Sequence, residues 1–240
     1  MKKKTIAIAA AGVVIVGAIT AFIFLNNSLG NKVEIESVIP AQEQETANGT
    51  NTANAAAATE GAGATVTAEQ LNGAWNIAGT SKVYWSVTTS KETVNFVDPS
   101  VTGTWNVNLD DAGAMTGEGT VEMSALDSGN GQRDEHVKGA DFLSVTEFPQ
   151  STFAVKSFSE LPAEWTEGTA VPVQLQGTMT VKGISKDVTF DSQAVYSGGQ
   201  LMLSGTTTVT FEDFGMINPH SIVLDTENNL EVRLELVLSK

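Results

Sequence analysis

The side chains best suited to chemistry lie close together near the middle of the chain: Ser128, Arg133, Asp134 and His136. Serine, histidine and a carboxylate form the nucleophilic triad, in which histidine takes the serine proton and the carboxylate orients the imidazole. However, no Gly-x-Ser-x-Gly nucleophile elbow occurs in the sequence. A hydrolase that uses Ser128 or His136 is therefore the weakest hypothesis, and we predict no catalytic residue. We favour a polar cluster that ties a short helix to a sheet.

Metal and redox chemistry have few candidate residues. The chain contains no cysteine and two histidines, His136 and His220, which excludes thiolate metal sites, disulfides and a three-histidine metal centre. His220 follows Pro219 in a predicted loop, where a lone histidine is typically solvated. Asp213-Phe214-Gly215 matches the magnesium-binding triplet of protein kinases, but no other kinase motif precedes it. We therefore predict neither a metal site nor a cofactor.

The net charge of the chain limits the kinds of partner that it can bind. The sequence has 13 Lys and Arg against 28 Asp and Glu, a net charge of −15, of which −14 falls on residues 66–240. Nucleic-acid binding needs a dense basic surface that releases counterions from the phosphate backbone. An acidic domain also has no electrostatic attraction to anionic lipid head groups. The composition therefore excludes nucleic acid, and any contact with a membrane must come from another part of the chain.

The first 65 residues divide into two unlike segments. Residues 5–25 carry no charge and follow three lysines; as a helix they would span ~32 Å, close to the thickness of a bilayer's hydrocarbon core. We favour a transmembrane anchor with residues 1–4 in the cytoplasm. The alternatives are a cleaved signal peptide, which has a shorter apolar core and a small-x-small cleavage site, and a buried core helix. Residues 26–65 are predicted to be a flexible linker.

The remaining residues, 66–240, show the period-two alternation of β-strands. Apolar side chains alternate with polar ones at 83–87, 105–109 and 230–238. One exception, 131–140, suits a short helix capped by Asn130. About eight strands, each with one apolar face, predict an antiparallel barrel or sandwich. Turn sequences stand between the runs, at Asp110-Asp111-Ala112-Gly113, Ser197-Gly198-Gly199 and Asn228-Asn229.

Large apolar side chains gather on the predicted strand faces. A barrel of about eight strands has an interior that side chains can fill or that can hold one small ligand. The residues alone favour a filled core over a cavity for a long apolar ligand. If a cavity exists, the side chains expected to line it are Trp75, Val83, Trp85, Trp105, Phe142, Phe153 and Phe211.

One stretch of the sequence favours a ligand cavity over a filled core. Residues 128–143 contain Arg133-Asp134-Glu135-His136 and Asp141-Phe142, and Phe148-Pro149-Gln150-Ser151-Thr152-Phe153 follows. This pattern closely resembles the signature of the YceI family of secreted bacterial lipid-binding proteins. Further stretches agree in family order over roughly 71–238: Ser81-Lys82-Val83-Tyr84-Trp85, Gly177-Thr178-Met179-Thr180-Val181-Lys182-Gly183-Ile184-Ser185-Lys186 and Asp213-Phe214-Gly215.

The resemblance implies an extended lipocalin-like antiparallel β-barrel. Its apolar interior would hold a polyisoprenoid, an isoprenoid quinone or a similar amphiphile, without catalysis. The chain departs from the family pattern at four positions: Phe211 stands where arginine is frequent, Thr80 where histidine is frequent, and Trp85 and Trp105 where phenylalanine is common. A lost polar group and larger rings would change head-group contacts or the depth of the cavity.

The cluster of Arg133, Asp134 and His136 has two interpretations beside this resemblance. Arg133 could bond a carboxylate in bidentate fashion and hold the helix against a strand end, which we favour. Alternatively, Arg133 and His136 could face the polar head of a ligand at the barrel mouth.

The predicted function is a membrane-tethered, extracytoplasmic binding protein that carries or stores a long apolar lipid, or a secreted one if residues 5–25 are cleaved. The alternative is a non-enzymatic cell-envelope module with a filled barrel and a protein partner. That alternative predicts no cavity and an exposed apolar patch. The sequence identifies neither the lipid nor a protein partner.

Overall fold

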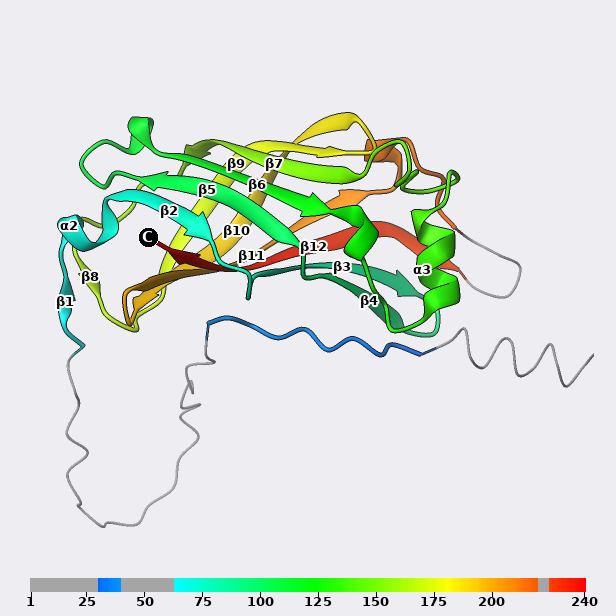
Figure 1. The fold of residues 1–240 in the computed structure, drawn as a ribbon, viewed down its shortest axis with the longest axis horizontal. Coiled ribbons are helices and arrows are strands. Elements are labelled where there is room, and N and C mark those ends of the chain that lie inside the picture. Colours follow the sequence, from blue (N-terminus) through cyan, green and yellow to red (C-terminus); the bar gives the residue numbers. More distant parts are fainter. Residues whose placement is uncertain (1–29, 40–62, 220–224) are drawn as a thin grey trace, which may run out of the picture.

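The computed structural model describes residues 30–39, 63–219 and 225–240, and most of them belong to one antiparallel β-barrel (Figure 1). The elements in chain order are β1 (Thr65–Val66), α2 (Ala68–Leu71), β2 (Gly73–Ile77), β3 (Lys82–Thr89), β4 (Thr93–Asp98), β5 (Val101–Val107), η1 (Ala112–Ala114), β6 (Thr116–Glu122), η2 (Met123–Ala125), α3 (Gly131–Lys138), β7 (Gln150–Phe158), β8 (Trp165–Thr166), β9 (Val171–Val181), β10 (Ile184–Ser197), β11 (Gln200–Thr210), η3 (Glu212–Phe214) and β12 (Thr226–Ser239).

A ring of eight strands closes the barrel, in the order β12, β2, β5, β6, β7, β9, β10 and β11, with β11 pairing again with β12. β2 and β3 follow one another along the same edge of β12, where Ile77 lies opposite Leu238 and Trp85 opposite Val232. β4 pairs with the outer edge of β3. The prediction of an all-β antiparallel barrel of about eight strands with one short helix is confirmed.

The alternation of apolar and polar residues places one face of each strand in the interior. In β9 every second residue from Val171 to Val181 is buried. The predicted turn between β10 and β11 is confirmed: Gly198 and Gly199 have φ values of +57° and +80°, a left-handed conformation that glycine adopts without steric cost.

The prediction of a turn at Asn228-Asn229 is wrong. Both residues lie within β12, and Asn229 pairs with Thr210 of β11. The pairing of β12 with β3 shifts register between Thr226 and Leu230. The two asparagines therefore lie at an irregularity within the strand, of the kind that a β-bulge makes, and not in a turn.

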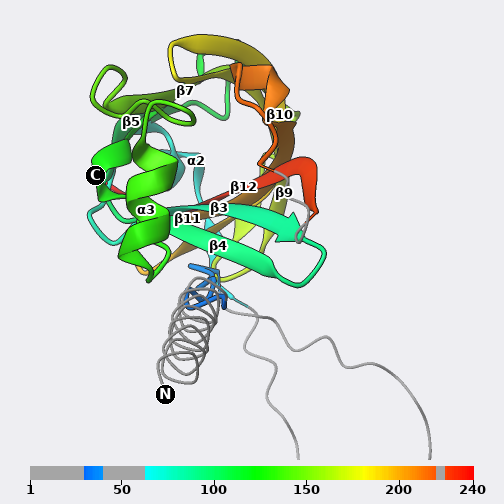
Figure 2. The same cartoon turned by 90° about the vertical axis from the view of Figure 1, so that its right-hand side faces the viewer.

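The predicted short helix is α3, and Asn130 caps it as expected. Asn130 Oδ1 accepts hydrogen bonds from the backbone N–H groups of Gln132 and Arg133, at 3.2 and 3.4 Å. The helix ends at Lys138, two residues earlier than predicted. It lies beside one end of the strand ring (Figure 2), which we call the mouth end. The single turn α2 lies at the opposite end, which we call the closed end (Figure 1).

Residues 30–39 lie extended against the outside of the barrel, along β3 and β12 (Figure 1); we call them the strap. Ser37 Oγ and the backbone N–H of Val38 donate hydrogen bonds to Glu235 Oε2, at 3.3 and 2.9 Å. The backbone N–H of Glu36 donates to the Tyr84 hydroxyl at 3.2 Å. Glu235 and Tyr84 occupy outward positions of their strands, yet they are 0% and 1% exposed. The strap therefore contributes to the packing of the outer face.

The strap falls within the segment 26–65 that the sequence assigns to a flexible linker. Its alternating Val33-Glu34-Ile35-Glu36 is the pattern that could have indicated a docked, extended segment. Residues 26–29 and 40–62 of the predicted linker lie outside the described residues.

The described residues include no helix whose length and apolar character would let it cross a membrane. The predicted anchor 5–25, residues 1–4 and His220 lie outside the described ranges. A transmembrane anchor therefore remains a prediction.

Candidate functional site

One cavity lies at the mouth end, beside α3; we call it the mouth chamber. Its volume is about 240 Å³. It reaches the surface, because His136 and Pro219 line it and are exposed. Its polar side chains are Thr89, Glu92, Arg133, His136 and Thr226. Its apolar side chains are Trp85, Val87, Val94, Phe96, Met123, Leu126, Val137, Phe142, Leu143, Val181, Phe211, Met216, Pro219 and Leu230.

Two smaller cavities continue the interior toward the closed end. The middle chamber has a volume of about 40 Å³, and the inner chamber about 30 Å³. Along β9 the order is clear: Val181 lines the mouth chamber, Met179 the middle chamber and Leu175 the inner chamber. The middle chamber is lined by Ile77, Val83, Trp85, Val101, Trp105, Gly119, Val121, Ser151, Thr152, Phe153, Met179, Phe190, Val232, Leu234 and Leu236.

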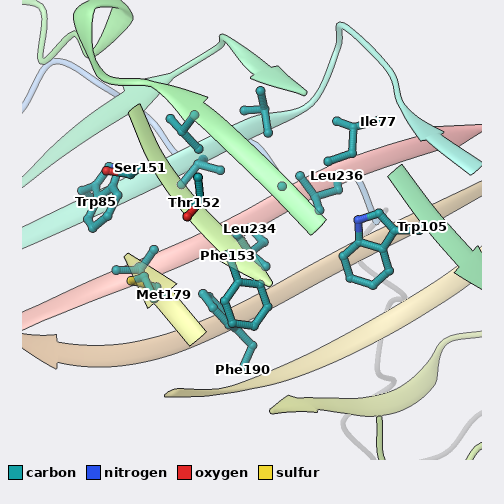
Figure 3. A pocket seen from close by; sticks show the side chains of 15 residues that line it. Ile77, Trp85, Trp105, Ser151, Thr152, Phe153, Met179, Phe190, Leu234 and Leu236 are labelled. Atoms are coloured by element: carbon teal, nitrogen blue, oxygen red, sulfur yellow. The ribbon is translucent and has the colours of Figure 1, made fainter. Parts of the chain in front are cut away.

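Two tryptophans separate the three chambers. Trp85 is the residue shared by the linings of the mouth and middle chambers, and Trp105 is the residue shared by the linings of the middle and inner chambers. Figure 3 shows Trp85 and Trp105 at opposite ends of the middle chamber, with Phe153 between them. The interior is therefore neither one continuous tunnel nor a filled core.

The strands place these rings by their register. Trp85 of β3 lies opposite Phe96 of β4 and Val232 of β12. Trp105 of β5 lies opposite Gly117 of β6. A Cβ atom on Gly117 would lie 3.0 Å from Cδ2 and Cε3 of the Trp105 ring, so the absence of a side chain at 117 makes room for the indole.

The four tryptophans of the chain differ in their hydrogen bonds. Trp75 Nε1 donates to the Leu71 carbonyl at 2.8 Å, and Trp165 Nε1 donates to the Pro162 carbonyl at 3.0 Å. The buried Nε1 atoms of Trp85 and Trp105 have no partner among the described residues. An unpaired buried N–H costs about 1–3 kcal/mol. Packing, rather than hydrogen bonding, therefore holds the two rings that divide the interior.

Asp134 has a structural role. Its Oδ1 accepts hydrogen bonds from the backbone N–H of Ser128 at 2.9 Å and from Ser128 Oγ at 2.6 Å, and Ser128 is fully buried. The serine hydroxyl therefore bonds the carboxylate directly, and His136 does not stand between them. Asp134 therefore ties α3 to the loop that precedes it.

Arg133 and His136 lie elsewhere, in the lining of the mouth chamber. Arg133 Nη2 donates to the Gly30 carbonyl of the strap at 3.0 Å, and Arg133 forms no salt bridge among the described residues. The His136 ring packs edge-to-face on Phe142, with 5.0 Å between ring centroids. The expected bidentate bond from Arg133 to a carboxylate is therefore wrong for the described residues.

Glu92, which no sequence pattern singles out, also lies at this rim. Its Oε1 and Oε2 accept hydrogen bonds from the backbone N–H groups of Gly30 and Asn31, at 2.6 and 3.0 Å. Glu92 and Arg133 line the mouth chamber, so together they hold the start of the strap at its edge. The sequence carries no signal for this contact, because 61 residues or more separate its partners.

One buried carboxyl near α3 is electrostatically unusual. Asp98, at the end of β4, is 0% exposed. Burial is the main cause that raises the pKa of Asp98 from 3.8 to about 6, and the charge of Glu122 adds to the rise. The hydrogen bond from the Ser100 N–H and the charge of Lys138 act in the opposite direction and lower this pKa. Its Oδ2 has no hydrogen-bond partner among the described residues. Such a group disfavours ionisation because the charged form loses its hydration.

The predicted lining residues are found at the following places. Phe142 and Phe211 line the mouth chamber, Val83 and Phe153 the middle chamber, and Trp85 and Trp105 the two boundaries. Trp75 lines none of these three cavities; it is 1% exposed and packs against Tyr196 at 6.4 Å between ring centroids. Its place at the closed end, where its indole bonds Leu71, explains the difference.

Asp213 and Phe214 belong to the turn η3 after β11, and Gly215 follows as its C-cap. Asp213 Oδ1 accepts a hydrogen bond from Lys186 Nζ at 2.6 Å, which lowers the pKa of Asp213, and Phe214 is fully buried. Across residues 30–39, 63–219 and 225–240, no three His, Asp or Glu side chains form a group suited to a metal ion.

Comparisons with known proteins find relatives of this chain. A family model described as the YceI-like domain matches residues 46–238. A UPF0312 protein of Shewanella sp. (strain W3-18-1) is 32% identical over 109 residues, which cover 43% of this chain and 53% of that protein. A UPF0312 protein of Pseudomonas putida (strain GB-1) is 31% identical over 122 residues, which cover 46% of this chain and 58% of that protein. The chain spans about half the length of the curated relatives it matches.

Two solved structures share the fold. Burkholderia cenocepacia BcnA has a TM-score of 0.57 and 17% identity, and the match covers 67% of this chain and 98% of that chain. A polyisoprenoid binding domain from Saccharophagus degradans, implicated in plant cell wall breakdown, has a TM-score of 0.54 and 10% identity, and the match covers 69% of this chain and 97% of that chain.

Proposed function

The chain belongs to the YceI-like family, and on that premise we propose that it binds an apolar lipid inside its barrel, outside the cytoplasm and close to a membrane. The observation that carries the proposal is the mouth chamber, with a volume of about 240 Å³ and mostly apolar walls. Ligand sites combine such walls with a few polar groups that fix orientation. The Saccharophagus protein of the same fold is a polyisoprenoid binding domain, which supports the same class of ligand.

The proposed ligand is a polyisoprenoid, an isoprenoid quinone or a similar amphiphile. Its apolar part would occupy the mouth chamber, and its polar head would lie near Arg133 and His136 at the rim. Burial of apolar surface, at about 25 cal/mol per Å², would supply the binding free energy. No group in this arrangement is assigned a catalytic step.

The position of the strap supports tethering to a membrane through residues 5–25. Glu92 and Arg133 hold Gly30 at the edge of the mouth chamber. Four residues lie between Gly30 and Leu25, the end of the apolar segment, so the Cα atoms of Gly30 and Leu25 are at most ~18 Å apart. If residues 5–25 cross a bilayer, the chamber opens close to the membrane that supplies the lipid.

Exposed apolar side chains support the same orientation. The large apolar residues exposed among those described are Ile184 (41%) and Ile217 (82%). Ile184 packs against Gly215, and Ile217 follows Met216, which lines the mouth chamber. The intact mass of the full chain recovered from membranes distinguishes a retained anchor from a cleaved signal peptide.

Lipid extraction tests the binding function. The full chain is purified, and its organic extract is analysed by mass spectrometry. We expect one class of apolar lipid in near-stoichiometric amount. Val137→Trp is the control, because the larger side chain takes up part of the mouth chamber from α3 without altering a strand; it should carry markedly less lipid than the wild type. A wild-type protein that carries no lipid and binds no apolar probe would contradict the proposal.

A second function, a cell-envelope module with a protein partner, has one observation in its favour. The middle and inner chambers, at about 40 and 30 Å³, show that much of the barrel is packed like an ordinary core. Complementation separates the two functions. If Val137→Trp restores the wild-type phenotype in a strain that lacks the protein, although it carries markedly less lipid, the module is favoured; loss of complementation favours lipid binding.

A further inference from the structure

The interior of the barrel is divided at Trp85 and Trp105. The mouth chamber and the middle chamber share Trp85, and the middle and inner chambers share Trp105. We propose that Trp85 determines the length of the apolar chain that this protein accepts, and that it limits the chain to the mouth chamber. This inference rests on the proposed function and specifies its ligand: a short apolar chain, or the terminal part of a longer one.

The volume sets the limit. An apolar cavity of ~150 Å³ holds one benzene molecule, which corresponds to roughly 25 Å³ for each carbon atom. The mouth chamber, at about 240 Å³, therefore holds about ten carbon atoms, the equivalent of two isoprene units. A longer chain would have to leave its remaining carbons in solvent or displace Trp85.

The space behind Trp85, on the side of the closed end, is too small for its ring to move into. The middle chamber behind it measures about 40 Å³, far less than an indole ring requires. Phe96 of β4 and Val232 of β12 stand opposite Trp85 on the neighbouring strands, and both line chambers themselves. A ring that turns the other way occupies the mouth chamber and removes the space that the ligand needs.

Trp105 forms a second partition behind the first. Its ring packs edge-to-face on Phe158, with 5.9 Å between ring centroids, and fills the space beside Gly117. Because Trp85 lies between Trp105 and the mouth, replacing Trp105 alone should not change which ligands fit. This order of the two rings supplies a matched control.

The test is a chain-length series of n-alkyl β-maltosides, from about six to about fourteen carbons, titrated calorimetrically into the full chain below their critical micelle concentrations. The sugar head is too large to enter the barrel, so only the alkyl chain is measured. Each buried methylene should lower Kd roughly fourfold. For the wild type we expect this gain to stop at about ten carbons, because further methylenes remain in solvent.

The variants locate the barrier. We call the chain length at which the affinity stops rising the break. In Trp85→Leu the break should move to longer chains by about two to four carbons, whereas in Trp105→Leu it should stay at the wild-type length. The double variant should move it further than Trp85→Leu alone. Circular dichroism checks folding, and Trp85→Phe is a milder replacement if Trp85→Leu does not fold; it should give a smaller shift in the same direction.

Three results would overturn the inference, and they are distinguishable. If the wild-type affinity keeps rising well beyond ten carbons, Trp85 is no barrier. If the break stays in place in the folded Trp85 variants, another residue sets it. If no maltoside binds the wild type or any variant, the proposed lipid-binding function itself fails. A break that moves in Trp85 variants but not in Trp105→Leu supports the inference.

Discussion

The two ends of the barrel are built differently. At the closed end, Trp75 is 1% exposed, its indole N–H bonds the Leu71 carbonyl, and Lys240 Nζ lies 4.8 Å from its ring centroid. Lys240 Nζ also donates to the carbonyls of Gln70 and Asn72. At the mouth end a chamber of about 240 Å³ remains open, and Arg133 Nε is buried without a partner among the described residues.

The difference between the two ends suggests that one end stabilises the fold and the other binds the ligand. Dense packing and paired polar groups stabilise a fold, whereas cavities and unpaired polar groups lower its stability. The closed end should therefore supply most of the stability of the barrel, and the mouth end should supply binding. Substitutions at the two ends should separate these properties.

The largest effect on stability is expected at the closed end. Trp75→Ala should lower the free energy of unfolding by about 3–5 kcal/mol, because it removes a large ring from a packed site. Phe142→Ala at the mouth end should cost markedly less, because Phe142 is only half-buried and borders a cavity. Urea denaturation of lipid-free protein measures both. Equal losses would show that the two ends do not differ in packing.

The next effect is a pH dependence of stability, which we expect from Asp98 at the end of β4 that is remote from the mouth chamber. The pKa of Asp98 rises from 3.8 to about 6 on folding, so the folded state binds this proton more tightly than the unfolded chain. The contribution of Asp98 to stability is therefore fully present below pH 3.8 and is lost as the pH rises through about 6.

Replacement of Asp98 should remove this dependence. At pH ~7, Asp98→Asn should be more stable than the wild type by on the order of 1–3 kcal/mol, because no charge is buried, and Asn Oδ1 still accepts from the Ser100 N–H. Thermal unfolding of both proteins between pH ~4 and pH ~7 measures the difference. A wild type that gains stability relative to the variant as the pH rises would contradict the sign.

A smaller effect should appear in binding rather than in stability. Phe142→Ala should weaken binding of a maltoside of about eight carbons roughly five- to tenfold, because the ring forms part of the chamber wall. Phe158→Leu is the matched control, since Phe158 lines the inner chamber and the ligand is not expected to reach it. Calorimetric titration measures both. A Phe158 variant that weakens binding as much as the Phe142 variant would place the ligand deeper in the barrel.

The smallest effect is expected at the start of the strap. Glu92→Ala removes the acceptors of the Gly30 and Asn31 N–H groups and should cost about 0.5–1.5 kcal/mol. Hydrogen exchange of residues 30–39, followed by mass spectrometry, should become faster. Glu212→Ala, which removes an exposed acidic side chain of η3, is the control and should leave that exchange unchanged. Unchanged exchange in Glu92→Ala would show that the rest of the strap holds its start in place.

The sequence predicted the parts of the site that depend on local pattern. The helix after Asn130, the inward faces of β3 and β12, and the aromatic side chains of the lining all follow from spacing along one segment. The strand pattern also predicts Trp75 in the lining, because that pattern does not distinguish one end of a barrel from the other. Glu92 was missed because its partners, Gly30 and Asn31, lie far away in the sequence.

The sequence by itself determined the fold class, the family and the faces of the strands, because side-chain alternation and short motifs are local properties. Only the tertiary structure decided that Trp85 and Trp105 divide the interior, since the volume left inside a barrel depends on side chains that meet across the ring from all its strands. It also placed the strap on Glu235, 197 residues away from Val38. Contacts at such separations follow from chain closure and packing, and no local pattern contains them.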